Sequence, residues 1–258
     1  MKISIVTISF NQSKFLRQCI DSVLSQEGVD LEYIVVDPAS TDGSRDIIES
    51  YGDRIVKVFE PDAGPADGLN KGFSKAKGEV FGFINSDDFF LPGALQKISD
   101  HFDKEGLNSF VSGGGFIENK NGSLQTVTPS RMTLNSCLYG ACTIFQQGTF
   151  FPASMFHQVG GFNTDNRTCW DGELFADFLA AGYNHKVIRD ALAVFRLHED
   201  SISGTGRLEK AYQDELKRIF KKIRGRGHMP LDSLLAVYWR ARKVALRILG
   251  QATGGAGA

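Results

Sequence analysis

Two adjacent carboxylates, Asp87 and Asp88, follow the apolar run Val80–Ile84 and are the residues of this sequence best placed to do chemistry. Side by side at the end of a buried strand, they repel each other unless a cation lies beside them. Mg²⁺ and Mn²⁺ prefer oxygen ligands and are typically held by one or two carboxylates together with substrate phosphates. The pair therefore indicates a metal site for a phosphorylated ligand such as a nucleoside diphosphate. Alternatively, Asp87 caps a helix that starts near Asp88, and the pair alone leaves both interpretations open.

Polar residues also follow the other apolar runs of the first hundred residues. The first run leads into Ser9–Asn11, the second into Asp37 and the third into Glu60–Gly64. A carboxylate in the position of Asp37 can accept hydrogen bonds from a base or a ribose. The Ser40–Gly43 segment is instead typical of a turn and a helix cap, so we interpret Asp42 as structural.

A sheet must position these strand ends. Apolar runs of strand length alternate with helical periodicity, which predicts a parallel sheet covered by helices on both faces, an α/β fold. Ligands of such sheets bind beyond the carboxyl ends of the strands, where the acidic residues stand. The predicted strands are Ile3–Ile8, Tyr33–Asp37, Ile55–Phe59 and Val80–Ile84, and the predicted helices are Phe15–Leu24, Thr41–Tyr51, Pro65–Lys77 and Pro92–Phe102.

The second half of the chain is less regular, and neither an internal repeat nor an interdomain linker is visible before residue 200. We expect a Gly-rich strand, a hairpin turn, a helix and two further strands. In chain order these are Phe110–Ile117, Asn121–Gly122, Asp171–Ala181, His185–Ile188 and Ala191–Leu197.

Composition bounds the class of protein. The chain has 258 residues, of which 42% are hydrophobic and 23% charged, as expected of a folded domain rather than a disordered chain. A net charge of -1 gives no overall attraction to nucleic acid, which we do not expect as a partner. The four cysteines form no CxxC pair, and no apolar run is long enough to span a membrane. The first residues read as a strand rather than a signal peptide, so we predict a cytoplasmic protein.

The charge is unevenly distributed along the chain. From Arg207 to the end there are 12 basic and 4 acidic residues, which predict a basic amphipathic helical extension at 207–249. Cationic helices that carry Trp and Tyr suit a membrane surface, so the extension could hold the protein at the inner face of the cell membrane. The alternative is that it packs on the catalytic domain. The Gly- and Ala-rich segment 250–258 predicts a disordered tail.

Five segments, in order, resemble the signatures of family 2 glycosyltransferases. They are Ile5–Asn11, Tyr33–Asp37 with Ser40–Ser44, Glu60–Gly64, Asp67–Gly72 and Asn85–Asp88. The resemblance covers residues 1 to about 203 and implies a GT-A catalytic domain at 1–206, with a mixed, mainly parallel sheet flanked by helices. Such hexosyltransferase-type enzymes transfer a sugar from a nucleotide diphosphate sugar to an acceptor hydroxyl, with inversion at the anomeric carbon and usually with Mg²⁺ or Mn²⁺.

The resemblance also implies roles for single residues. Asp37 matches the acidic residue that binds the base, usually uracil, so a UDP-linked donor is expected. Asp87 and Asp88 match the metal-binding element, in which Asn85 takes the place of the first aspartate. The implied nucleotide-sugar contacts are Ser9, Asn11, Asp37, Asp67, Asn70, Lys71 and Asp87.

An inverting transfer needs one general base near the acceptor hydroxyl, on the face opposite the leaving diphosphate. The Thr168–Phe175 segment resembles the family segment that supplies this base, with Asp171 as the first choice and Glu173 as the second. From the residues alone, Asp171 is more simply a helix cap and Glu173 a partner of the helix dipole.

Four further positions follow from the resemblance or lie beside it. Gln146 and Gln147 stand on the acceptor side, where many family members have His. His198 lies in the Phe195–Ser203 segment, whose His can reach the metal or the diphosphate, although a loop His is often inert. Trp170, beside the predicted base, either stacks on a sugar or packs in the core.

Two other functions remain to be distinguished from a transferase. One is a non-catalytic nucleotide-sugar-binding regulator, which would not need both a metal site and a base. The other is a nucleotidyltransferase, which usually carries a Gly-rich, basic loop after its first strand; Ser9–Ser13 is neither. The resemblance favours a transferase in bacterial surface polysaccharide or glycolipid synthesis, with a saccharide or lipid-linked acceptor.

Overall fold

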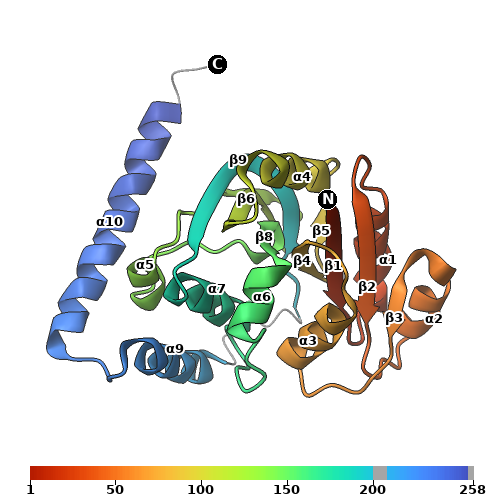
Figure 1. Cartoon of the computed structure of the whole chain (residues 1–258), viewed down its shortest axis with the longest axis horizontal. Helices are drawn as coiled ribbons and strands as arrows, with labels where there is room; N and C mark the ends of the chain where they lie inside the picture. The colour runs from red at the N-terminus through yellow and green to blue at the C-terminus, as the bar shows by residue number, and fades with distance from the viewer. Residues whose placement is uncertain (200–207, 255–258) are drawn as a thin grey trace.

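The computed structural model describes residues 1–199 and 208–254, with residues 246–254 described as backbone only. The predicted domain boundary at 206/207 and the segment Asp200–Ser203 of the predicted closing loop therefore lie outside the described residues. The chain forms one nine-stranded sheet with helices packed on both faces (Figure 1).

The first half of the sheet is parallel, as the sequence predicts. Strand β1 (Lys2–Ile8) lies between β2 (Asp30–Val36) and β4 (Val80–Asn85), and β3 (Val56–Val58) extends the sheet beyond β2. All three pairings are parallel. Because the strands run the same way, the loops that follow them gather at one edge of the sheet.

The second half of the sheet is mixed. Strand β8 (Thr149–Pro152) is antiparallel to β4 and to β6 (Ser109–Glu118). Strand β9 (Asn184–Arg196) is parallel to β6 and antiparallel to β5 (Phe89–Phe90). The two strands predicted at 185–188 and 191–197 are thus one long strand, and irregular pairing near Gly114 absorbs the break in its apolar pattern.

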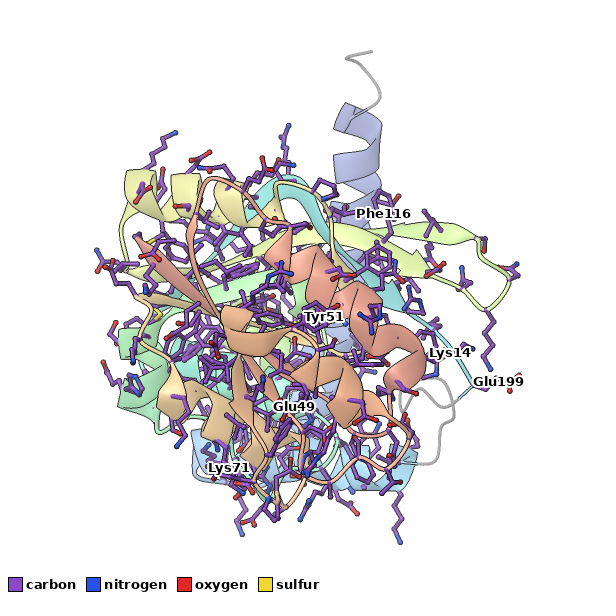
Figure 2. All side chains as sticks on the ribbon, turned by 90° about the vertical axis from the view of Figure 1, so that its right-hand side faces the viewer. Lys14, Glu49, Tyr51, Lys71, Phe116 and Glu199 are labelled. Atoms are coloured by element: carbon purple, nitrogen blue, oxygen red, sulfur yellow. The ribbon has the colours of Figure 1, made fainter. Side chains whose placement is uncertain are left out.

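Strand β7 (Leu124–Val127) pairs with β6 in the predicted hairpin, which extends sideways from the body of the molecule (Figure 2). Gly122 turns the chain there with a positive φ of 78°. Strand β6 therefore pairs with β7 along one of its edges and with β9 along the other.

Apolar side chains bury the two faces of the sheet under different helices. One face packs against α1 (Ser13–Leu24), α2 (Ser44–Glu49) and α4 (Ala94–Glu105). The other packs against α3 (Pro65–Lys75), α6 (Ala153–Val159) and α7 (Trp170–Ala180). Two 3₁₀ turns, Gly52–Arg54 and Gln146–Gly148, and the short helix α5 (Leu134–Leu138) complete the body.

Helix α2 is shorter than predicted because its first residues form a cap. Asp42 accepts hydrogen bonds from the backbone N–H groups of Ser13 (2.8 Å) and Ser44 (3.0 Å), at the starts of α1 and α2. Gly43 adopts a left-handed φ of 91° just before α2. The structural role predicted for Asp42 is confirmed.

The C-terminal extension consists of two helices, α9 (Glu209–Arg224) and α10 (Pro230–Gly254). Helix α9 packs on the body through Ile219 and Phe220, and α10 runs along the side that carries α5 (Figure 1). Helix α10 continues to Gly254, past Leu249, where the sequence predicted the helical extension to end. Within the described chain, no helix combines the length and the apolar character needed to cross a membrane.

Candidate functional site

A cleft of about 1800 Å³ opens at the carboxyl ends of β1 to β4. Its walls are the loops after these four strands, the loop between β7 and α5, the 3₁₀ turn at Gln146–Gly148, the start of α7 and one side of α10. Pockets for single small ligands usually measure about 300–1,000 Å³. The cleft is therefore large enough for two substrates side by side.

Two buried polar atoms at the carboxyl ends of β1 and β2 lack partners within the described part of the chain. They are the hydroxyl oxygen of Ser9 and Oδ2 of Asp37. The other carboxylate oxygen of Asp37 accepts hydrogen bonds from the Ser40 N–H (2.8 Å) and from Nε of Arg45 (3.2 Å). Buried polar atoms are normally satisfied, so both atoms are suited to receive a ligand. Ser9 lines the cleft, and Asp37 directly precedes the lining residue Pro38.

Asn11 ties the first loop to the second. Its N–H donates to the Ser40 hydroxyl (2.8 Å), and its side-chain oxygen accepts a hydrogen bond from the Thr41 N–H (2.9 Å). It has a positive φ of 53°, which asparagine tolerates better than most residues. Asn11 does not line the cleft, so it supports the loops rather than facing the site.

Asp67 and Lys71 brace the loop after β3. Asp67 accepts hydrogen bonds from the Ala63 N–H (2.9 Å) and from Nζ of Lys71 (2.8 Å), and Lys71 also donates to the Pro61 carbonyl (2.5 Å). Neither side chain lines the cleft; Asp62, in the same loop, does. Burial raises the pKa of Asp62. Sequence reasoning included Asp62 in a motif without giving it a role.

Asn70 is also structural here. Its amide nitrogen donates to the Phe162 carbonyl (2.8 Å), and its oxygen accepts a hydrogen bond from the Phe162 N–H (2.9 Å). These two bonds fasten α3 to the loop before α7. The Asp67–Gly72 segment thus positions the cleft wall, and its three predicted contact residues do not face the cleft.

Asp87 and His198 come together at the cleft, although they are far apart in the sequence. Oδ2 of Asp87 lies 2.9 Å from Nε2 of His198, and the ring of Phe15 packs against the imidazole. Asp87 lines the cleft. The helix cap considered for Asp87 is wrong, because Asp87 and Asp88 lie in a turn that leads into β5.

Asp88 has a different environment. Its side chain is 1% exposed; Oδ1 accepts a hydrogen bond from the Arg196 N–H (2.9 Å) and Oδ2 accepts one from Nε2 of Gln147 (2.8 Å). Burial, reinforced by the neighbouring Asp87, raises the pKa of Asp88 well above its ordinary value. Of the two carboxylates among the predicted metal ligands, Asp87 faces the cleft and Asp88 holds β9 and the Gln147 side chain in place.

Several side chains hold the turn that contains Asp87 and Asp88 in place. The Arg196 guanidinium donates to the Asp87 carbonyl (2.9 Å) and to Glu118 (2.9 Å). Gln146 lines the cleft, but its amide nitrogen donates to the Phe83 carbonyl (2.8 Å). Gln146 and Gln147 therefore use their amide groups to brace the turn, a role that their place on the acceptor side did not reveal.

A metal ion would find few protein ligands here. Within residues 1–199 and 208–254, no three His, Cys, Asp or Glu side chains form a metal-holding group. Asp87 with His198 fits Mg²⁺ or Mn²⁺ nevertheless, because these ions commonly take only one or two carboxylates and complete their shell with substrate phosphates and water.

Asp171 lies in the first turn of α7 and lines the cleft. Burial raises the pKa of its carboxyl group, and the hydrogen bond from the Gly172 N–H (2.8 Å) only partly opposes this effect. A carboxylate with a raised pKa is a stronger base. Trp170 packs its ring on Phe83 and Phe162, as the core alternative predicted, and it also lines the cleft.

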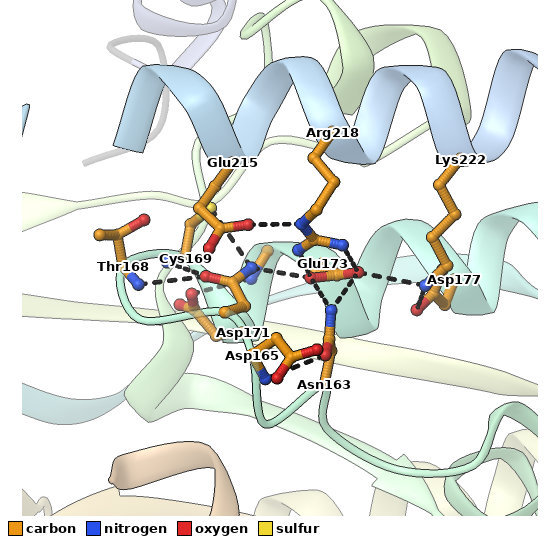
Figure 3. Close-up of polar contacts among 12 residues, drawn as sticks. Asn163, Asp165, Thr168, Cys169, Asp171, Glu173, Asp177, Glu215, Arg218 and Lys222 are labelled. Carbon is orange, nitrogen blue, oxygen red and sulfur yellow. Dashed lines mark hydrogen bonds and ion pairs between the residues drawn. The ribbon is translucent and has the colours of Figure 1, made fainter. Parts of the chain in front are cut away.

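Glu173, the second choice for the base, points away from the cleft toward α9 (Figure 3). Its carboxylate accepts hydrogen bonds from the side chains of Asn163, Asn166, Arg218 and Lys222. Burial opposes ionisation, but these hydrogen bonds, with that from Arg218 the strongest, lower the pKa of Glu173 to about 2. So weak a base, held by so many donors, does not fit general-base catalysis.

Sequence reasoning missed the contribution of α10 to the cleft. Trp239, Arg242 and Lys243 line it, together with Arg131 and Arg167 from the body. Nζ of Lys243 donates to the Cys142 carbonyl (3.0 Å). The cationic pattern of α10 was visible, but nothing local in the sequence indicates which face of a helix meets a cleft formed by distant segments.

A family model described as glycosyl transferase family 2 matches residues 4–188. An uncharacterized glycosyltransferase of Nostoc is 40% identical to the chain over 106 residues, 40% of this chain and 33% of that protein, so the match spans about a third of that relative. An uncharacterized glycosyltransferase of Rickettsia typhi is 26% identical over 92% of this chain and 80% of its own length. The putative teichuronic acid biosynthesis glycosyltransferase TuaG of Bacillus subtilis is 27% identical over 78% and 81%.

Solved structures share the fold. TarS of S. aureus in complex with UDP-GlcNAc superposes with a TM-score of 0.72 at 18% identity, covering 94% of this chain and 69% of that one. The mannosyltransferase PcManGT of Pyrobaculum calidifontis, in complex with GDP-Man and Mn²⁺, superposes with a TM-score of 0.64 at 18% identity, covering 99% and 76%. The predicted GT-A fold is confirmed.

Proposed function

The chain belongs to glycosyltransferase family 2, and on that premise we propose that its cleft transfers a sugar from a nucleotide diphosphate sugar to an acceptor hydroxyl, with inversion at the anomeric carbon. The observation that carries the proposal is that Asp87 and Asp171 face one cleft with room for two substrates. A metal-binding carboxylate and a separate carboxylate base are the two groups that such a transfer needs.

The donor nucleotide belongs at the end of the cleft formed by the loops after β1 and β2. Oδ2 of Asp37 and the hydroxyl of Ser9 are buried there without a partner among the described residues. A carboxylate oxygen can accept the N–H of a uracil ring, so we propose a UDP-linked donor. The structure of TarS contains UDP-GlcNAc, which supports this assignment. That of PcManGT contains GDP-Man, so the identity of the nucleobase needs an experimental test.

The diphosphate belongs beside Asp87 and His198, which would hold Mg²⁺ or Mn²⁺. Such an ion neutralises the charge that develops on the leaving diphosphate. Asp87 binds and orients this end of the donor, while Arg196 and Asp88 fix the turn from which Asp87 projects.

Asp171 supplies the general base. It removes the proton of the acceptor hydroxyl as that oxygen bonds to the anomeric carbon from the face opposite the diphosphate. The bond between the anomeric carbon and the phosphate oxygen breaks in the same displacement, so the nucleoside diphosphate leaves and the proton stays on Asp171. The raised pKa of Asp171 suits this step, because a stronger base accepts the proton more readily.

Thermal-shift titration with UDP, GDP, dTDP, CDP and ADP, each with and without Mn²⁺, tests the donor site. We expect UDP to stabilise the protein most, by about 2.7 kcal/mol at 100 times its Kd, with a larger effect in Mn²⁺. Asp37→Asn should weaken the preference for UDP, and Asp87→Ala should abolish the effect of Mn²⁺. Asp165→Asn, an exposed change outside the cleft, is the control. If no diphosphate shifts the transition, the transferase proposal is wrong.

Asp171→Asn separates a transferase from the two other functions. It should bind UDP as the wild type does but lose release of UDP from the donor in the presence of acceptor. A non-catalytic binding protein would show no UDP release in either form. A nucleotidyltransferase would instead release pyrophosphate from a nucleoside triphosphate and a sugar phosphate.

We also propose that α10 contacts the inner face of the cell membrane. Helix α10 exposes a series of large apolar side chains, whereas Arg240, Arg242 and Lys243 lie against the body or line the cleft. The large apolar residues exposed on α10 are Leu231, Leu234, Val237, Tyr238 and Val244. An amphipathic helix of this kind suits a lipid surface. TuaG is named for teichuronic acid biosynthesis, which supports a role in bacterial surface polysaccharide or glycolipid assembly with a lipid-linked acceptor.

A further inference from the structure

The two ends of the cleft differ in charge. Asp62 and Asp87 line the end formed by the loops after β3 and β4, where the donor is proposed to bind, and Arg167 donates there to the Ala63 carbonyl. The far end is lined by Arg131, from the loop between β7 and α5, and by Arg242 and Lys243 of α10. We call these three residues the cationic end of the cleft.

The cations of this end are not paired with carboxylates in the part of the chain that the structure describes. None of the three side chains forms an ion pair with a carboxylate of the described residues. Nζ of Lys243 donates to a neutral acceptor, the Cys142 carbonyl, and the Arg242 guanidinium lies 5.1 Å from the centre of the Trp239 ring. Three cations that line one cleft and form no ion pair attract an anion.

The cationic end adjoins the proposed base. Lys243 contacts the backbone of Cys142, and both Lys243 and Asp171 lie close enough to the Cys142 thiol for their charges to act on it. A molecule bound at the cationic end is therefore next to Asp171, on the acceptor side of the cleft. The donor diphosphate has its own place beside Asp87.

We propose, resting on the proposed function, that the cationic end binds a phosphate group of the acceptor, which is therefore a phosphate-bearing molecule. Two guanidinium groups and an ammonium group match a phosphate in charge, and arginine bonds phosphate oxygens in a two-pronged geometry. The phosphate could belong to a lipid headgroup or to a soluble phosphate ester, and both offer the same chemistry to these side chains.

The test uses the full chain saturated with UDP and Mn²⁺, titrated in a calorimeter with three probes. Farnesyl phosphate represents a lipid phosphate, glycerol 1-phosphate a soluble ester, and farnesol is the uncharged comparison. We expect at least one phosphate probe to bind and farnesol to bind more weakly. Binding of farnesyl phosphate alone identifies a lipid source, whereas binding of both identifies the phosphate group as sufficient. If neither phosphate binds better than farnesol, the proposal is overturned.

Variants locate the bound phosphate. Arg242→Gln and Lys243→Gln should each weaken binding of the phosphate probe about tenfold, because each removes a charge-assisted hydrogen bond. Arg240→Gln makes the same charge change on the same helix, but Arg240 contacts the Tyr139 carbonyl and does not line the cleft, so it should have little effect. An equal loss in Arg240→Gln would show a general effect of charge and overturn the subsite.

The affinity for UDP separates this proposal from the proposed function. Arg242→Gln and Lys243→Gln should leave the Kd for UDP unchanged, because the donor binds at the other end of the cleft. If the wild type fails to bind UDP, the donor site is refuted, and the phosphate titration repeated without UDP still decides the subsite. If the variants lose UDP and phosphate together, the cationic end binds the donor and the inference is wrong.

Discussion

Asp87 and Asp88 are adjacent in the chain, yet their side chains have separate tasks. Asp87 reaches the cleft and meets His198, whereas both oxygens of buried Asp88 bind groups of the protein. The sequence identified the acidic pair but could not divide its roles, because the partners of Asp88 come from residues far along the chain. The role of each carboxylate depends on the residues that it contacts, and the folded structure is needed to identify them.

Substitution of Asp88 should lower the stability of the protein much more than substitution of Asp87. Asp88→Ala leaves the Arg196 N–H and the Gln147 amide without their acceptor, which we expect to cost about 1–3 kcal/mol of unfolding free energy for each group. Asp87→Ala removes only the contact with His198 at the edge of the cleft, so it should cost less than about 1 kcal/mol. Urea unfolding of both variants without ligand measures the difference. Equal stabilities would contradict the division of roles.

The pH dependence of the reaction should show Asp171. The base must be ionised, so the rate rises with pH through its pKa, which burial raises above 3.8. We expect the acid limb of the kcat profile to lie above that value. The pH profile of Asp171→Glu should keep an acid limb, with a lower kcat than wild type, whereas Asp171→Asn should lose most activity. A profile that is flat through the acid range would argue against Asp171 as the base.

The raised pKa of Asp171 also makes the stability of the folded protein depend on pH. Because the folded pKa of Asp171 is raised, its ionisation destabilises the folded state as pH rises through that pKa. Asp171→Asn should therefore gain stability relative to wild type between about pH 4 and about pH 7. Thermal unfolding at both values checks this, and a gain that is larger at the lower pH would contradict the assigned shift.

At the scale of elements, the clamp between α7 and α9 keeps the base in place. Glu173 and Asp171 lie in the same first turn of α7, and Arg218 and Lys222 of α9 hold the Glu173 carboxylate (Figure 3). The N-terminal half of the sheet was predictable because alternating strands and helices leave a local pattern. The joining of two predicted strands into β9 and the α7–α9 clamp depend on distant partners and were not predicted.

Breaking the clamp should destabilise the protein in a pH-dependent way. Arg218→Met removes the main partner of Glu173, and because Arg218 is partly exposed we expect a loss of about 1–3 kcal/mol. The lowered pKa of Glu173 means that its contribution is present above about 4.5 and is lost as pH falls toward about 2. The deficit of Arg218→Met should therefore shrink between about pH 7 and about pH 3.

The matched control is Lys217→Met, which breaks an exposed ion pair with Asp214 on the same helix. This change should cost less than about 0.5 kcal/mol at either pH. Urea unfolding of the two variants gives the comparison. If Lys217→Met is as unstable as Arg218→Met, the loss reflects α9 itself rather than the clamp on Glu173.

At the scale of the whole molecule, α10 has two different sides. Its inner side closes the cleft with Trp239, Arg242 and Lys243, and its outer side exposes apolar residues. The sequence showed an amphipathic cationic helix and offered membrane contact or packing on the domain as alternatives. The structure shows the packing, and the apolar outer side supports the proposed membrane contact as well. A helix can serve both purposes because its opposite faces are independent.

Membrane contact should depend on the outer side of α10. The double variant Leu234→Glu, Val237→Glu should float with anionic vesicles at least tenfold less than wild type, because each charge replaces apolar contact with lipid. Leu124→Glu, at an equally exposed leucine of the β6–β7 hairpin, is the control and should float normally. Flotation of the double variant at the wild-type level would exclude α10 as the contact.

Both tryptophans of the chain, Trp170 and Trp239, line the cleft, one beside the proposed base and one on α10. The tryptophan fluorescence of this protein therefore arises within the cleft itself. Trp239→Phe leaves an emitter beside the proposed base, and Trp170→Phe leaves one at the cationic end. In each variant, the fluorescence of the remaining tryptophan can therefore report ligand binding in its own part of the cleft, without an added label.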